Sequence, residues 1–331
     1  MPLDSGDLTP GFSNIRFFNH VQTSTLPLLI LLCCLTPQTS KLRWLWLGVT
    51  TYWWMALFAT DGRGTLLGVV AGCMITAMLA WRRSVPYLRR VAVTAILGLL
   101  AYFLFLVVVP ALIGVHGMSS LSDTIERTAA DPASGRWPLW HLAIALIKEQ
   151  PWLGVGPMHF AHYTGQLHIA AHPHDWLLQI GAEWGIPALL CLLAALALGG
   201  RALLRAGARI ARDDTDNQAV FSALVVGAVA ILVDGLVSGI FVMPQSQLAI
   251  ALYLGCAIGW QRTIIPAVSA TAPGGVWRLA GTACIVMAMA GVIAGAWPQA
   301  LAKLHNEELT PAEQALNNGS QWPRLWKAGH F

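Results

Sequence analysis

The residues best suited to proton transfer lie close together in the second half of the chain. They are His172, His174, Asp175, Gln179 and Glu183. Histidine titrates near neutral pH and can serve as a base. The Pro173-His174-Asp175 order indicates a helix start with Asp175 as its N-cap. In such a helix Asp175, Gln179 and Glu183 recur every fourth residue and form one polar stripe. Polar packing at a membrane interface would also explain the stripe, but ionisable groups in a spanning segment usually mark a functional site.

Two arginines are placed to bind an anionic group. Arg63 lies in the turn 61–64 (DGRG), whose glycines let the backbone bend and leave the guanidinium able to make bidentate contacts. Taken alone, Arg63 equally fits a side chain that reaches lipid headgroups. Arg136 begins the motif Arg136-x-x-x-Trp140. Asp234 lies within an apolar run and therefore needs a partner, such as Arg63 or Arg136.

Two further segments resemble ligand sites only loosely. The glycines of 151–157 (PWLGVGP) favour a tight turn, and a phosphate loop is excluded because no GK[ST] sequence follows. His159, His162 and His168 could form a zinc site together with the His-Pro-His pair. No acidic or cysteine ligand completes that set, so we expect no metal.

The composition requires a membrane environment for these residues. Of 331 residues, 56% are hydrophobic and 11% are charged, whereas a soluble domain carries roughly 25% charged residues. The mean hydropathy of +0.60 excludes intrinsic disorder. The net charge of +4 gives no support for nucleic-acid binding. All six cysteines lie in apolar runs and indicate small core residues rather than disulfides.

Apolar segments predict an all-α fold, a polytopic transmembrane bundle of about seven or eight spans. The predicted spans are 21–37, 42–60, 64–81, 91–115, 176–199, 219–242, 248–260 and 276–297. We expect a single membrane domain over 1–331. Its predicted parts are four spans in 1–115, a periplasmic loop over 116–175, four spans in 176–297 and a periplasmic tail over 298–331. Short helices are expected in the loop at 122–130 and 136–150, and the second is too short to span, which favours an interfacial or re-entrant amphipathic helix.

Basic residues in the short connections predict the orientation, because cytoplasmic loops retain positive charge. The two clearest clusters are Arg82, Arg83, Arg89, Arg90 and Arg201, Arg205, Arg209, Arg212. If the spans alternate, all ten histidines fall on the opposite, periplasmic side, where chemistry is then expected. The N-terminus also becomes periplasmic although no signal sequence precedes it. We therefore expect further helices upstream.

The ordered combination of motifs resembles one family of membrane enzymes. The motifs are 61–67 (DGRGTLL), Arg136-x-x-x-Trp140, 151–157 (PWLGVGP) and 172–185, with His-x-His-Asp-x-x-Leu and Glu-x-Gly. They resemble the O-antigen ligase and polymerase superfamily of bacterial inner-membrane glycosyltransferases. Asp175 stands where the family usually has Asn, which retains capping ability but changes the charge. Residues 14–22 resemble a periplasmic loop that other members carry midway along their spans, so the chain corresponds to their C-terminal two-thirds.

The resemblance implies transfer of a glycan from undecaprenyl pyrophosphate to an acceptor hydroxyl at the periplasmic face, within membrane lipid. Such a reaction needs a base for the hydroxyl proton and cations for the leaving pyrophosphate. The implied base is His174, with His172 as the second choice. The implied pyrophosphate ligands are Arg63 and Arg136, with Arg16 as a weaker third.

Two supporting roles and the absence of a cofactor complete this hypothesis. Gln179 and Glu183 could orient the base from one helix face, and Asp234 could neutralise an arginine. Two or three arginines supply the charge that a metal would otherwise provide, and the loops contain no pair of acidic residues suited to a metal. We therefore expect a metal-independent enzyme without a cofactor.

The sequence is compatible with more than one glycan acceptor and with more than one class of function. A lipid A core sugar, a growing O-antigen chain and a Ser or Thr of a protein could each accept the glycan, and the short tail 298–331 favours the first. A transporter that gathers ions with its histidines would need polar residues across the whole membrane. The spans offer only Asp234 and the Glu183 stripe, both near the periplasmic side. An inactive remnant stays possible because of the expected missing helices.

Overall fold

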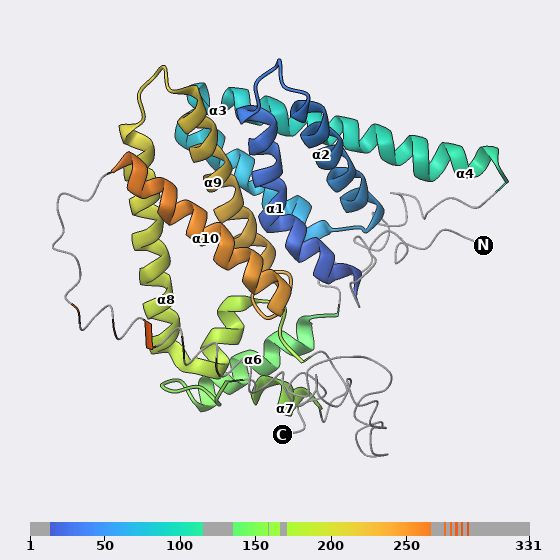
Figure 1. The fold of residues 1–331 in the computed structure, drawn as a ribbon. Helices are drawn as coiled ribbons and strands as arrows, with labels where there is room; N and C mark the ends of the chain where they lie inside the picture. The colour runs from blue at the N-terminus through green and yellow to red at the C-terminus, as the bar shows by residue number, and fades with distance from the viewer. Residues whose placement is uncertain are drawn as a thin grey trace. The chain divides into compact units, whose positions relative to one another are not determined.

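The computed structural model describes residues 14–114, 135–157, 159–165 and 171–265, together with isolated positions between 275 and 290. Every regular element in these residues is helical, which confirms the all-α prediction (Figure 1). Contacts divide the chain into two units, and the description below concerns the first, which contains residues 1–264. The predicted helix 122–130, the tail 298–331 and most of the predicted span 276–297 lie outside the described residues.

The helices follow the predicted apolar segments closely. They are α1 (Ile15–Leu35), α2 (Leu42–Ala59), α3 (Arg63–Tyr102), the π-helix η2 (Phe103–Val108), α4 (Val109–Leu112), α6 (Trp137–Glu149), α7 (His159–Gly165), α8 (Trp176–Arg209), α9 (Thr215–Gly235) and α10 (Pro244–Ile264). Four stretches are long and apolar enough to cross a membrane, namely Ile15–Leu35, Arg63–Leu112, Trp176–Arg209 and Thr215–Gly235. The chain is thus a multi-pass membrane protein, and the count of seven or eight spans stays a prediction.

One predicted loop is wrong, because its residues belong to helix α3. The arginine-rich connection predicted after residue 81 is helical, and the chain turns instead at Ala80, whose backbone leaves the helical region with φ −151° and ψ 43°. Figure 1 shows the chain changing direction within α3. Arg83 donates a hydrogen bond to the carbonyl of Gly207 at the end of α8 (3.4 Å). A kink at Ala80 within α3, rather than a loop, therefore separates the two predicted apolar segments.

Glycines bring α3 and α9 into close contact. A Cβ atom added at Gly68 would lie 2.6 Å from the carbonyl oxygen of Ala230, and one added at Gly72 would lie 2.5 Å from that of Val226. Small residues at such spacing let two helix backbones approach closely in a membrane protein. Gly64, one turn earlier, lies against the carboxylate of Asp234. The glycine face thus brings the 61–64 turn to the end of α9.

Helix α8 is broken near its start, and the loop 151–157 packs against the break. Gly185 adopts φ +82°, a conformation that glycine tolerates and other residues rarely adopt. The carbonyls of Ala182 and Glu183, freed there, accept hydrogen bonds from the backbone N–H groups of Val155 (2.8 Å) and Gly156 (3.1 Å). The predicted tight turn at 151–157 therefore also docks a loop onto α8.

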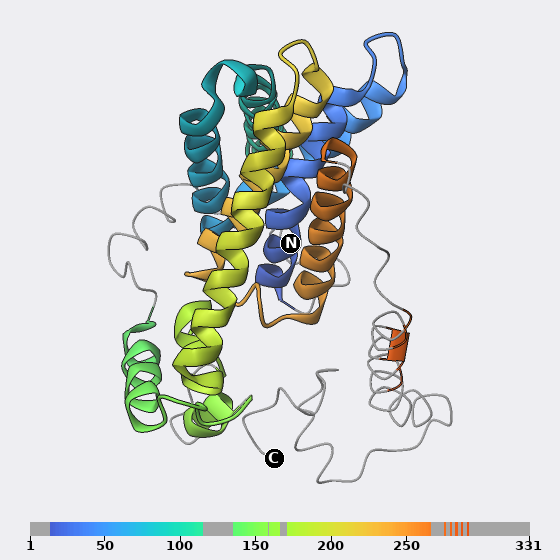
Figure 2. The same ribbon diagram turned by 90° about the vertical axis from the view of Figure 1, so that its left-hand side faces the viewer.

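Helix α6 confirms the short helix predicted at 136–150. Its 13 residues extend about 20 Å, less than the roughly 30 Å of a bilayer core. Figure 2 shows α6 beside the first part of α8. Leu139, Ala143 and Leu146 of α6 pack with Ala182 of α8 in one buried apolar cluster. This packing holds the α6 start and the α8 start next to each other.

Candidate functional site

The segment that leads into α8 is held in a strained conformation. His174 has φ +56°, which is uncommon for any residue other than glycine and costs of order 1–3 kcal/mol. Two tryptophans hold the chain on either side of it. Trp140 of α6 donates from Nε1 to the carbonyl of Pro173 (3.0 Å), and Trp176 donates to the carbonyl of Leu232 in α9 (3.2 Å). Hydrogen bonds to α6 and α9 therefore hold the chain on both sides of His174.

Asp175 caps α8 as predicted. Its carboxylate accepts hydrogen bonds from the backbone N–H groups of Leu177 (2.9 Å) and Leu178 (3.0 Å). Burial raises the pKa of Asp175, and these two hydrogen bonds counteract the rise. Gln179 is half-buried, and Glu183 is buried in the turn before the break. Their predicted role in orienting a base stays a prediction.

Five cationic or titratable side chains meet at the start of α8, and we call them the histidine cluster. Its members are Arg16, His20, Arg136, His172 and His174. His174 interacts electrostatically with the other four, His20 also with His172 and Arg16, and His172 also with Arg136. The rings of His172 and His174 have centroids 4.1 Å apart and planes at 83°. Gly239 leaves room for them, since a Cβ there would lie 2.5 Å from Nε2 of His172. The cluster joins α1, the start of α6 and the start of α8.

The environment keeps His172 and His174 neutral. Burial, and then the positive charge of Arg136, lowers the pKa of His172 to about 4. Burial is also the largest cause that lowers the pKa of His174 far below its usual range, followed by His172 and the two arginines. Neutral imidazole has one ring nitrogen that can accept a proton. Both rings can therefore act as acceptors at neutral pH.

His20 is the member of the cluster that the sequence did not single out. Only 5% of it is exposed. Its Nδ1 atom and that of His172 are both buried, and within the described part of the chain neither has a hydrogen-bond partner. A sequence signal existed: Asn19, Gln22 and Thr23 lie around His20 at helical spacing, so the first turns of α1 carry a polar face.

A second set of buried polar groups lies beside the cluster, and we call it the hydroxyl network. It consists of Asn19, Thr23, Thr60, Thr65 and Asp234. Thr23 donates to the Asp234 carboxylate (2.6 Å), and the Thr23 and Thr65 hydroxyls lie 2.7 Å apart. Thr65 donates to the carbonyl of Asn19 (3.0 Å), whose amide donates to Thr60 (2.7 Å). The network therefore joins α1, α2, α3 and α9.

Asp234 has different direct partners from those expected. Arg63 and Arg136 were the predicted partners, but the hydrogen bonds to its carboxylate come from the hydroxyls of Thr23 and Ser238. Arg136 acts on Asp234 through its charge. Hydroxyls replace an ion pair here because the close α3–α9 contact at Gly64 leaves the carboxylate beside small polar residues.

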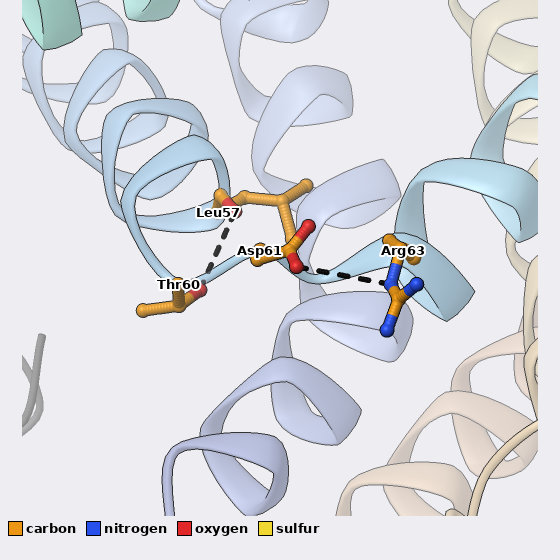
Figure 3. A network of polar contacts seen from close by, with 4 residues as sticks. All are labelled: Leu57, Thr60, Asp61 and Arg63. Carbon is orange, nitrogen blue, oxygen red and sulfur yellow. Dashed lines mark hydrogen bonds and ion pairs between the residues drawn. The ribbon is translucent and has the colours of Figure 1, made fainter. Parts of the chain in front are cut away.

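Arg63 is paired within its own turn. Its Nε lies 3.7 Å from Oδ2 of Asp61, and both side chains are partly exposed (Figure 3). Asp61 adopts φ +53°, which closes the turn. The Thr60 hydroxyl donates to the carbonyl of Leu57 (3.4 Å), so the turn is anchored to the end of α2 (Figure 3). The cations that act on the histidines are Arg16 and Arg136.

The zinc alternative is not tested by the structure. His159 is exposed, and its Nδ1 lies 3.2 Å from the carbonyl oxygen of Pro157. The side chain of His162 and all of His168 lie outside the described residues.

The fold and site together define a class of protein. Several helices are long and apolar enough to span a membrane, and one end of the bundle gathers two guanidinium groups and three imidazoles. Such an arrangement suits a membrane enzyme that binds an anionic group and moves a proton.

Comparison with known families agrees with this class. A family model described as O-antigen ligase matches residues 28–193, half of the chain, and the chain belongs to this family. The protein is therefore a multi-pass bacterial membrane protein with glycosyltransferase activity of the ligase and polymerase type. The match includes Arg63, Arg136 and the His-Pro-His segment, whereas Arg16, His20 and Asp234 lie outside it. The search of curated proteins gave no match.

Proposed function

We propose that the protein transfers a glycan from undecaprenyl pyrophosphate to a hydroxyl of the lipid A core, at the periplasmic face of the inner membrane. The observation that carries the proposal is the histidine cluster, where neutral imidazoles and two arginines lie together. The acceptor hydroxyl loses its proton to an imidazole, and its oxygen bonds to the anomeric carbon of the glycan. The bond from that carbon to the pyrophosphate oxygen breaks, and undecaprenyl pyrophosphate leaves with the electron pair.

His174 is the base in this proposal. It is half-buried, whereas His172 is buried, so His174 is the more accessible of the two rings to an acceptor. A positioned general base contributes about 10²- to 10⁴-fold to a reaction rate. The strained backbone at His174, held by Trp140 and Trp176, is typical of a residue whose position matters more than its local stability.

Arg16 and Arg136 neutralise the leaving pyrophosphate in this proposal, with Arg63 as a third cation. Guanidinium groups bind phosphate oxygens bidentately and remain charged at any physiological pH. The Arg63–Asp61 pair is partly exposed and therefore weak, so a phosphate oxygen can replace Asp61. The reaction would then proceed without a metal.

Binding of the donor would also prepare the base. The charges of Arg136 and Arg16 contribute to the low pKa of His174. The negative charge of pyrophosphate would offset these arginines and raise that pKa. His174 would thus become a stronger base when the donor is bound.

The proposal is tested by complementation of a ligase-deficient strain with the parent and with His174→Ala and Arg136→Ala, at checked expression levels. We expect capped lipopolysaccharide on a gel with the parent and none with either variant. His141→Ala is the matched control, because His141 is exposed and its Nδ1 already contacts the Trp137 carbonyl oxygen (2.8 Å). The ligase proposal fails if the inserted parent gives no capped product while the linked donor accumulates.

A further inference from the structure

His20 is a buried polar ring whose Nδ1 atom finds no partner among the described residues. It lies in the second turn of α1 and is 5% exposed. Its Nδ1 atom is buried and, in the described part of the chain, forms no hydrogen bond. Leaving such an atom unpaired costs about 1–3 kcal/mol, so an apolar side chain would serve the packing of α1 better. A ligand that pairs with Nδ1 would account for the histidine.

The neighbours of His20 indicate the chemistry of that ligand. His20 interacts electrostatically with His172, whose Nδ1 is also buried without a partner, and with the Arg16 guanidinium. The Asp234 carboxylate is hydrogen-bonded to Thr23, which lies one turn further along α1 than His20. Two unpaired ring nitrogens beside cationic side chains favour an oxyanion.

We propose that His20 binds the pyrophosphate of the donor, with Nδ1–H donating a hydrogen bond to a non-bridging oxygen. The inference rests on the proposed function and adds a residue from α1, outside the range that matches the family model. His172 supplies a second ring nitrogen to the same group, and Arg16 and Arg136 supply the charge. His174 stays available to the acceptor.

The test measures binding of inorganic pyrophosphate to the purified full-length protein by isothermal titration calorimetry. His20→Leu keeps the volume but has no donor, and we expect its Kd to rise about tenfold or more, as for the loss of a hydrogen bond to a charged group. His20→Asn carries an amide nitrogen near the position of Nδ1, and we expect a Kd within about threefold of the parent. The exposed residue His141 provides the control variant His141→Ala, which should bind as the parent does.

A comparison of two amides keeps the test decisive if His20→Leu does not fold. His20→Gln places its amide nitrogen near Nε2 rather than Nδ1, so we expect weaker binding than with His20→Asn. Equal binding by the parent and His20→Leu, or a Gln variant as good as the Asn variant, overturns the role of His20.

The outcomes also separate this inference from the proposed function. A parent protein that does not bind pyrophosphate refutes both the donor assignment and the role of His20. Pyrophosphate binding that depends on His20, together with failed complementation, overturns the lipid A acceptor and leaves the role of His20 standing.

Discussion

The hydroxyl network and the histidine cluster are both buried and polar, and α1 contributes to both, but they differ in how their atoms are paired. In the network, Thr23 and Asp234 lie 2.6 Å apart and Asn19 and Thr60 lie 2.7 Å apart. In the cluster, His20 and His172 each bury an Nδ1 atom for which the described residues provide no partner. Buried polar groups that are fully hydrogen-bonded stabilise a structure, whereas a buried polar group without a hydrogen bond costs free energy and requires an explanation. The difference shows that the network joins the helices, and it supports our proposal that the cluster binds the donor.

The largest expected effect is a loss of folding stability at acidic pH that arises in the histidine cluster. The pKa of His172 is about 4 in the folded protein and near 6.5 in the unfolded chain. The unfolded state therefore binds more protons between these values, and stability present above about pH 6.5 is lost as the pH falls toward 4. The loss from His172 alone is about 3 kcal/mol.

Thermal unfolding followed by tryptophan fluorescence between pH 7.5 and 4 measures this loss. On acidification, the unfolding midpoint of the parent should fall further than that of His172→Asn, whose side chain at this position cannot titrate. Parallel pH profiles for the two proteins would contradict the assigned environment of His172.

The network is tested by removing one hydroxyl. Thr23→Val keeps the side-chain shape but takes a hydrogen bond from the buried Asp234 carboxylate, so we expect a loss of about 2 kcal/mol in the free energy of unfolding. Thr36→Val is the control, because the hydroxyl of Thr36, the C-cap of α1, donates to the carbonyl of Leu32 in the last turn of that helix. Equal losses for the two variants would show that the network does not join the helices. His20→Leu, in contrast, removes an unpaired buried polar atom and should not lower the unfolding midpoint below that of the parent.

The smallest expected effect concerns the support of His174. Trp140→Phe keeps an aromatic ring but removes the hydrogen bond to the Pro173 carbonyl, which is worth about 1 kcal/mol. We expect a roughly fivefold lower rate of glycan transfer with a nearly unchanged unfolding midpoint. Trp152→Phe, whose ring is exposed, should transfer as the parent does. If Trp140→Phe transfers glycan at the rate of the parent, the Trp140 hydrogen bond does not position His174.

Local patterns predicted most of the described fold. The apolar segments predicted α1, α2, α8 and α9, and the Pro173-His174-Asp175 order predicted the N-cap of α8. The arginine-rich segment after residue 81 was expected to be a loop and is helical. Charge alone does not end a helix, because arginine is a good helix former and its long side chain can reach the polar end of a neighbouring helix.

The sequence by itself determined the class of protein, its apolar helices and the residue types available for chemistry, because these depend on composition and on spacings of a few residues. Only the tertiary structure decided which polar groups are paired. Thr23 and Asp234 are 211 residues apart in the chain. Their hydrogen bond, and the meeting of His20 with His172, depend on how α1, α8 and α9 pack, which no local pattern specifies. That packing separates the paired groups, which stabilise the fold, from the unpaired ring nitrogens to which we assign a ligand.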